Sequence, residues 1–302
     1  MISILSKVCR LSVFLVLLNI SANAQDSLTV VEANNNCSLG MQASFSVIIP
    51  QAKLKDVTSS WKKFIKQGTK KSVEEEGKEF ILSQAVIPAL GTDTFTVYAH
   101  AESTDRGINF ISFYHWNDSL FISSALDVSK SEKIKSLVRQ FAVEQYKNAV
   151  KDELEDAQRT LKNLNNDLEE LFSQNDRSEK NIKEYERSIE RLKSEIKINE
   201  KETEMKSEEV IRQKQVVESF SGTPEAKELE DKKFKDLNKQ KKRLQKDNES
   251  MHQDIDDFES KIKAREKSIN QNSQDFIPAK KESIKTQENL VKSIEEKLKN
   301  IH

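Results

Sequence analysis

The stretch Phe220-Ser221-Gly222-Thr223-Pro224 interrupts a helical pattern that otherwise runs from about residue 130 to the C-terminus. Gly222 is the only glycine after Gly107, so this is the one place in the second half of the chain where glycine can end a helix in the left-handed conformation. Thr223 can cap a new helix, and Pro224 suits its first position. The stretch therefore predicts a tight reversal at residues 222–224 between two long helices.

On both sides of this turn, apolar residues recur with the alternating spacing of three and four that is typical of a coiled coil. The first repeat runs from Val150 to Phe220 and the second from Phe234 to Phe276, each without a slip. A helix packed in a globular core would not keep a period of 3.5 residues for so long. We predict one coiled-coil arm over residues 129–221 and a second over residues 225–302.

If the chain folds back between Thr223 and Pro224, two residues face each other across the hairpin when their numbers sum to 447. In that register two polar layers coincide, because Asn199 faces Asn248 and Asn175 faces Asn272. A buried asparagine that faces an aliphatic side chain loses hydrogen bonds, so both layers penalise any other register. The register also places Lys206 opposite Lys241, which is unfavourable unless both side chains reach solvent. The pattern favours an antiparallel hairpin over a parallel dimer of extended arms.

The second arm is expected to be broken near Pro278, because the apolar frame shifts by one residue there. Beyond this point facing numbers sum to 448, which places Ile294 opposite Leu154 and Leu298 opposite Val150. Proline removes one helical hydrogen bond and kinks a helix. Each arm of about 75 residues would extend about 110 Å at the helical rise of 1.5 Å per residue.

Residues 40–128 have the sequence pattern of a small α+β domain. Strand-like alternation at residues 44–50 is followed by helical spacing over residues 54–65, and strand patterns return at residues 80–87, 94–102 and 108–116. The expected order is β-α-β-β-β, with a short edge at residues 120–122. The fold class predicted for the chain is α+β, a small N-terminal domain followed by a long antiparallel coiled-coil hairpin. Residues 25–39 are polar and were expected to be flexible.

Residues 1–24 have the pattern of a secretory signal peptide. Lys7 and Arg10 precede an apolar run, and Ala24 and Gln25 would flank the cleavage site. An uncleaved anchor is the alternative, although the run is shorter than the roughly 20 residues needed to span a bilayer. We expect a periplasmic or secreted protein without a membrane span after signal removal, in which Cys37 is the only remaining cysteine.

The sequence carries no recognised catalytic motif. It lacks a phosphate-binding loop, a dinucleotide-binding fingerprint, a zinc-protease motif and a nucleophile elbow. His100 and His115 lie on neighbouring predicted strands, but no third ligand accompanies them. The net charge of −1 argues against a nucleic-acid partner. We therefore expect no catalytic residues, no metal and no cofactor, although an enzyme of unrecognised type stays an alternative.

Two segments are candidate binding sites. The aromatic residues Trp61, Tyr114, Trp116 and Phe121 either pack in the core or line an apolar groove for a peptide or glycan. Phe220, at the turn, either closes the last layer of the hairpin or docks a partner. These features favour a non-enzymatic exported protein, a monomer or weak oligomer, whose hairpin acts as a spacer or docking arm toward a protein partner in the cell envelope. The alternative is a ligand-binding or peptide-binding head that its coiled coil multimerises.

Overall fold

The computed structural model describes residues 28–67, 69–116 and 120–302, and these residues form two compact units. The first unit contains residues 28–158 together with residues 289–302, and the second contains residues 159–288. The predicted signal peptide, its cleavage site at Ala24 and Gln25, and Gly68 lie outside the described residues. The fold class is α+β, as the sequence predicts, with a seven-stranded antiparallel sheet followed by long helices.

The sheet of the first unit has the strand order β1-β2-β6-β5-β4-β3, and β7 pairs with β6. Its strands are β1 (Val31–Cys37), β2 (Gly40–Ile49), β3 (Glu74–Glu76), β4 (Glu79–Val86), β5 (Thr94–Thr104), β6 (Gly107–Trp116) and β7 (Leu120–Phe121). The predicted order β-α-β-β-β corresponds to β2, helix α2 (Leu54–Ile65), β4, β5 and β6. The expected short edge is β7, whereas β3 lies between α2 and β4, where the sequence predicted no strand.

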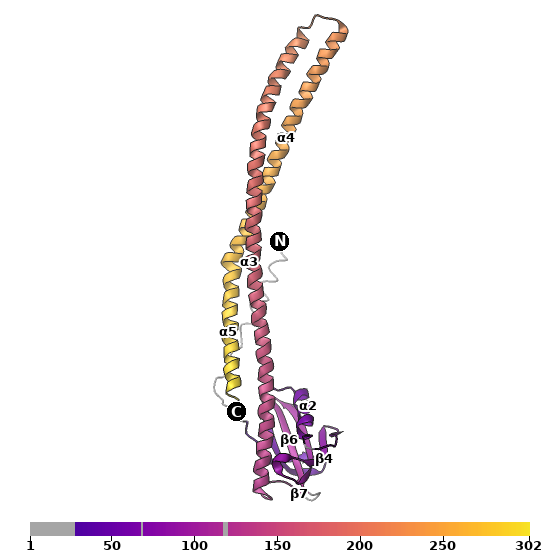
Figure 1. Cartoon of the computed structure of the whole chain (residues 1–302), viewed down its shortest axis with the longest axis vertical. Helices are drawn as coiled ribbons and strands as arrows, with labels where there is room; N and C mark the ends of the chain where they lie inside the picture. The colour runs from indigo at the N-terminus through magenta and orange to yellow at the C-terminus, as the bar shows by residue number, and fades with distance from the viewer. Residues whose placement is uncertain (1–27, 68, 117–119) are drawn as a thin grey trace. The chain divides into compact units, whose positions relative to one another are not determined.

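One face of this sheet carries the main hydrophobic core, which α2 and the first turns of α3 (Val128–Glu218) cover (Figure 1). Helix α2 contributes Val57, Trp61 and Ile65, which recur at intervals of four and therefore share one side of the helix. Helix α3 contributes Ile134 and Phe141, both fully buried. The same helix that later enters the coiled coil therefore begins as part of a globular core.

Helix α3 begins at Val128, one residue before the predicted start of the arm at residue 129, and Asp127 caps it. The Asp127 Oδ1 atom accepts a hydrogen bond of 2.9 Å from the backbone N–H of Lys130. The Lys130 ammonium group also contacts Asp127 Oδ2 at 3.1 Å and the carboxylate of Asp93 at 3.4 Å. The hydrogen bond from the Lys130 N–H, together with this ammonium group, lowers the pKa of Asp127.

The expectation that residues 25–39 are flexible is wrong for the residues that form β1. Strand β1 pairs with β2 along its whole length. Only residues 45–49 of β2 pair with β6. The end of the β1–β2 hairpin that carries Cys37 packs on the face of the sheet opposite the main core. There the backbone N–H of Ser38 donates to both carboxylate oxygens of the buried Glu79 at 3.1 Å. A polar composition indicated disorder, but long-range pairing compensates for the lack of apolar residues.

The Glu32 carboxylate attaches β1 to the start of α3. It accepts hydrogen bonds from the backbone N–H of Ser124 at 2.7 Å and from the Ser131 hydroxyl at 2.9 Å, and it lies 3.5 Å from the Lys135 ammonium group. Burial by itself raises the pKa of Glu32, but the hydrogen bonds and the Lys135 charge outweigh burial and hold the pKa below its usual value. This carboxylate therefore contributes to stability in its ionised form.

We expect Glu32→Gln to lower the free energy of unfolding of the first unit at pH 7 by about 1–2 kcal/mol. Because folding lowers the Glu32 pKa, its contribution is complete above the unfolded-state value near 4.5 and is lost as the pH falls through the lower folded value. The difference between the wild-type protein and the variant should therefore shrink below about pH 4.5. Urea titrations at several pH values measure this difference. The exposed Glu132→Gln change is the control and should have little effect, since surface pairs contribute little.

The second unit is an antiparallel pair of helices, as predicted. It contains the distal part of α3 together with α4 (Pro224–Gln271), the π-helical segment η2 (Asn272–Phe276) and the first part of α5 (Ile277–Lys299). Ile189, Leu192 and Ile196 of α3 form a buried cluster with Ile255 of α4. The pair Leu192 and Ile255 belongs to the register whose numbers sum to 447. Lys206, opposite Lys241 in that register, reaches out and contacts Glu209 at 2.7 Å.

The one-residue shift of the apolar frame occurs in η2, just before Pro278. A π-helical turn holds one residue more than an α-helical turn, and the backbone N–H of Ile277 accordingly bonds to the carbonyl of Asn272, five residues earlier. Phe276 is thereby turned out and is 46% exposed, whereas Ile277 is 7% exposed. The expectation that Phe276 forms a core layer is wrong, because the extra residue lies before Phe276 and not at Pro278.

No described helix is both long and apolar enough to cross a membrane.

Candidate functional site

The turn between the two arms has the capping chemistry that its sequence predicts. Helix α3 ends at Glu218, and Thr223 Oγ1 accepts a hydrogen bond of 3.4 Å from the backbone N–H of Ala226. Pro224 is the first residue of α4, where its missing N–H costs nothing, and Glu225 lies in the positively polarised first turn. The turn residues Ser221, Gly222, Thr223 and Pro224 are exposed.

Gly222 has a different role from the expected left-handed helix end, because its φ is not positive. A Cβ atom built on Gly222 would lie 2.7 Å from the Cε1 and Cζ atoms of the Phe220 ring. Glycine therefore allows the Phe220 ring to lie directly against the turn backbone. Phe220 is half-buried with its ring against the turn backbone, whereas Ser221, Gly222, Thr223 and Pro224 are exposed.

The two predicted asparagine layers differ in their hydrogen bonds. Asn272 Nδ2 donates to Asn175 Oδ1 at 2.8 Å, and both residues are buried. Asn175 Nδ2 in turn donates to the Ser273 hydroxyl at 3.3 Å. In the other layer, Asn248 Oδ1 is buried without a hydrogen-bond partner among the described residues, and Asn199 accepts a bond from Thr203 only through its backbone oxygen. The hydrogen-bonded Asn175–Asn272 pair is the layer that specifies the register.

The proposed aromatic groove is wrong, because Trp61 and Tyr114 are buried in the main core, against which Trp116 also packs, and Phe121 lies on the opposite face of the sheet. Trp61 and Tyr114 are almost completely buried in the main core. Phe121 packs on the opposite face, where its ring stacks on His115 at 4.7 Å. Trp116 is half-buried beneath the Lys130 ammonium group, which lies 4.2 Å from its ring centre. Side-chain alternation along β6 separates Tyr114 from the face to which Phe113 and His115 belong.

Tyr114 offers a direct stability test of this placement. Its hydroxyl is buried without a well-formed hydrogen bond, because the adjacent Ser112 hydroxyl, which also lies 3.4 Å from the carbonyl oxygen of Phe45, interacts with it only weakly. We expect Tyr114→Phe to leave the free energy of unfolding unchanged or to raise it by up to about 1 kcal/mol, because the desolvated hydroxyl makes no well-formed bond. A loss of more than about 1 kcal/mol in urea unfolding would contradict this placement.

The second face of the sheet brings Cys37, Glu79 and His100 near one another without forming a reactive centre. His100 Nδ1 lies 4.0 Å from Glu79 Oε1. Burial and the Glu79 charge raise the pKa of the Cys37 thiol, which disfavours the nucleophilic thiolate. Among the described residues, no three His, Cys, Asp or Glu side chains are placed so that they could hold one metal ion.

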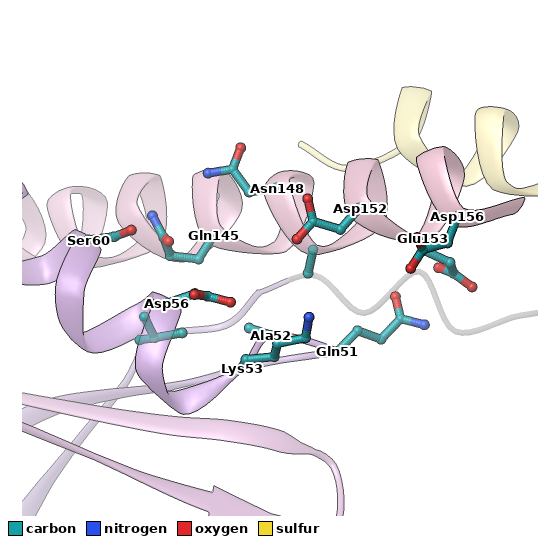
Figure 2. A pocket seen from close by; sticks show the side chains of 12 residues that line it. Gln51, Ala52, Lys53, Asp56, Ser60, Gln145, Asn148, Asp152, Glu153 and Asp156 are labelled. Carbon is teal, nitrogen blue, oxygen red and sulfur yellow. The ribbon is translucent and has the colours of Figure 1, made fainter. Parts of the chain in front are cut away.

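A cleft that the sequence did not indicate lies in the first unit, between α3 and the segment that leads into α2 (Figure 2). Its volume is about 460 Å³, which is within the range of small-molecule sites. Figure 2 shows Asp152 projecting from α3 toward the segment that carries Gln51 and Lys53. The two walls are about 90 residues apart in the sequence, and no local motif signals their meeting. The side chains of the cleft are Gln51, Lys53, Asp56, Gln145, Asp152 and Glu153, together with smaller neighbours and Asp156.

Comparisons with protein families and with curated proteins find no match to this chain.

Proposed function

We propose that this protein is a non-enzymatic exported protein whose coiled-coil hairpin acts as a spacer or docking arm in a cell-envelope assembly. The observation that carries the proposal is the buried Asn175–Asn272 hydrogen bond, which defines one antiparallel register within a single chain. A spacer must hold a constant length, and a polar layer prevents the two arms from sliding along each other. At 1.5 Å per residue, residues 159–218 of α3 alone extend about 90 Å.

The hairpin satisfies its own apolar seam, which supports a monomer or weak oligomer over a multimerised head. Leu192, Ile196 and Ile255 are buried by one another within the chain. The Lys280 ammonium group also contacts the Asp167 carboxylate at 3.0 Å, so charged residues beside the seam pair within the hairpin as well. A coiled coil between chains would have to replace these interactions.

Partner docking at the turn can be tested by photo-crosslinking in the producing cells. A photoreactive amino acid at the exposed Ser221 is expected to capture a discrete partner, because this side chain faces solvent beside the Phe220-capped turn. The matched control carries the same amino acid at Ser194, an exposed position along the arm. Equal capture from both positions, or capture from neither, would contradict docking at the turn.

A paired deletion tests the spacer directly. Removing residues 200–206 and 241–247 deletes one heptad from each arm, and these residues face each other in the register that sums to 447. The arm should shorten by about 10 Å while the Asn175–Asn272 layer keeps its register. As a length-matched control, the two heptads are replaced by copies of residues 193–199 and 248–254.

We expect the shortened hairpin to remain helical and monomeric by circular dichroism and sedimentation, but to lose capture from Ser221. The length-matched control should keep both properties. Undiminished capture by the shortened protein would show that arm length is not used. Chains that associate strongly at micromolar concentration would instead favour the multimerised head.

A further inference from the structure

We infer that the cleft between α2 and α3 binds an alkylammonium group, such as that of a polyamine or of a lysine side chain. This inference concerns the first unit alone and does not depend on the proposed role of the hairpin. The cleft is lined by four carboxylates and by the Lys53 ammonium group, and Lys297 pairs with one of the four carboxylates, that of Glu153. This charge difference favours a cation, and the size of the cleft allows one to enter with several methylene groups.

The carboxylates come from both walls and can surround a cation. Asp56 lies in the first turn of α2, on one wall of the cleft. Asp152 projects from α3 on the opposite wall (Figure 2). An ammonium group has three donors, which one carboxylate alone does not satisfy. Two carboxylates on separate helices provide acceptors from two directions.

Gln145 gives a second, independent indication of a ligand. It is only 6% exposed, lines the cleft and forms no side-chain hydrogen bond with another described residue. The amide of Gln145 is not completely buried, so its polar atoms remain accessible from the cleft. An ammonium group in the cleft can donate to the Gln145 carbonyl oxygen, which gives this amide the partner that it lacks.

The chain itself shows how the rim of the cleft binds an alkylammonium group. The Lys297 ammonium group, from the C-terminal helix of the same unit, contacts Gln51 Oε1 at 2.5 Å and Glu153 Oε2 at 2.9 Å. Gln51 and Glu153 both line the cleft. Lys297 therefore binds two residues that line the cleft, while the side chains of Asp56, Gln145 and Asp152 remain for a second cation.

The test measures binding of two probes to the full chain in 150 mM salt, which screens attraction by distant charges. Spermidine represents a free polyamine, and an acetylated and amidated trilysine peptide represents lysine side chains of a polypeptide. Backbone NMR shifts should change within residues 51–60 and 145–156 for whichever source fits. Binding of spermidine alone identifies a small polyamine, and binding of the peptide alone identifies a protein partner. If neither probe shifts these residues, the inference is wrong.

Three variants separate a site from a general acidic surface. Asp56→Asn/Asp152→Asn should raise the dissociation constant about tenfold or more, because two charge-assisted bonds are lost. Asp176→Asn/Asp236→Asn removes the same charge from exposed positions in the other unit and should change affinity less than about twofold. Gln145→Leu should weaken binding about fivefold without loss of stability in urea unfolding. Unchanged affinity in the Asp56→Asn/Asp152→Asn variant would overturn the inference.

Discussion

Replacing Phe141 with alanine is expected to lower the free energy of unfolding of the first unit by about 3–5 kcal/mol, which is comparable to the whole stability of a small domain. Phe141 is fully buried, and its ring centre lies 5.0 Å from that of Trp61 and 5.1 Å from that of Phe110. Its loss leaves a cavity where α3 packs on α2 and the sheet. The chain contains only two tryptophans, Trp61 and Trp116, so tryptophan fluorescence reports on this unit alone.

The expected result is an early fluorescence transition in urea, while the helical signal of the hairpin persists to a higher concentration. Phe172→Ala is the matched control, since Phe172 lies on the same helix but is 44% exposed. That change should cost less than about 1 kcal/mol. If Phe141→Ala and Phe172→Ala shift the fluorescence transition equally, the docking of α3 on the sheet is wrong.

Replacing Asn175 with leucine is expected to destabilise the hairpin by about 1–3 kcal/mol, although the new side chain is more apolar. The change leaves the buried Asn272 amide, which is 6% exposed, without the acceptor that it uses at 2.8 Å. The double variant Asn175→Leu/Asn272→Leu should recover the loss, because neither helix then buries an unpaired amide. Thermal unfolding followed by circular dichroism measures both differences.

Asn248→Leu provides the contrast for this prediction. Asn248 Oδ1 is already buried without a partner, so its replacement should be neutral or stabilising by about 1 kcal/mol. Equal losses from Asn175→Leu and Asn248→Leu would show that the two asparagine layers are equivalent. The double leucine variant should also lose specificity of register, which a disulfide between cysteines at positions 199 and 248 in a Cys37→Ser background can detect.

The coiled-coil hairpin was predictable because its determinants are local and periodic. The core spacing follows from the helical repeat, and one fold-back point then pairs the layers up to the one-residue shift in η2. Leu192 with Ile255 and Asn175 with Asn272 follow from that single choice. The one-residue shift of the apolar frame was also predictable, but its position was not. A π-helical turn before Pro278 and a kink at Pro278 both leave the apolar residues after Pro278 in the same frame.

The first unit was predictable only in part. Strand and helix periods located β2, α2, β4, β5 and β6, but alternation alone did not indicate which face each side chain covers. The pattern therefore allowed a groove lined by Trp61 and Tyr114, two residues that the fold buries in the core. Strand β1 was missed for a related reason, because Glu32 and Ser38 are stabilised by residues 92 and 41 positions away.

The sequence by itself determined the two long helices, the turn between them and the register in which they pair. These properties depend on the spacing of apolar residues within a few helical turns and on a single point at which the chain reverses. Only the tertiary structure decided that β1 is ordered, that Gly222 makes room for the Phe220 ring, and that Gln145 and Asp152 meet Asp56 across a cleft. The order of β1 and the cleft depend on contacts between distant segments, which no periodic pattern encodes, and the Gly222 contact depends on the backbone conformation of the turn.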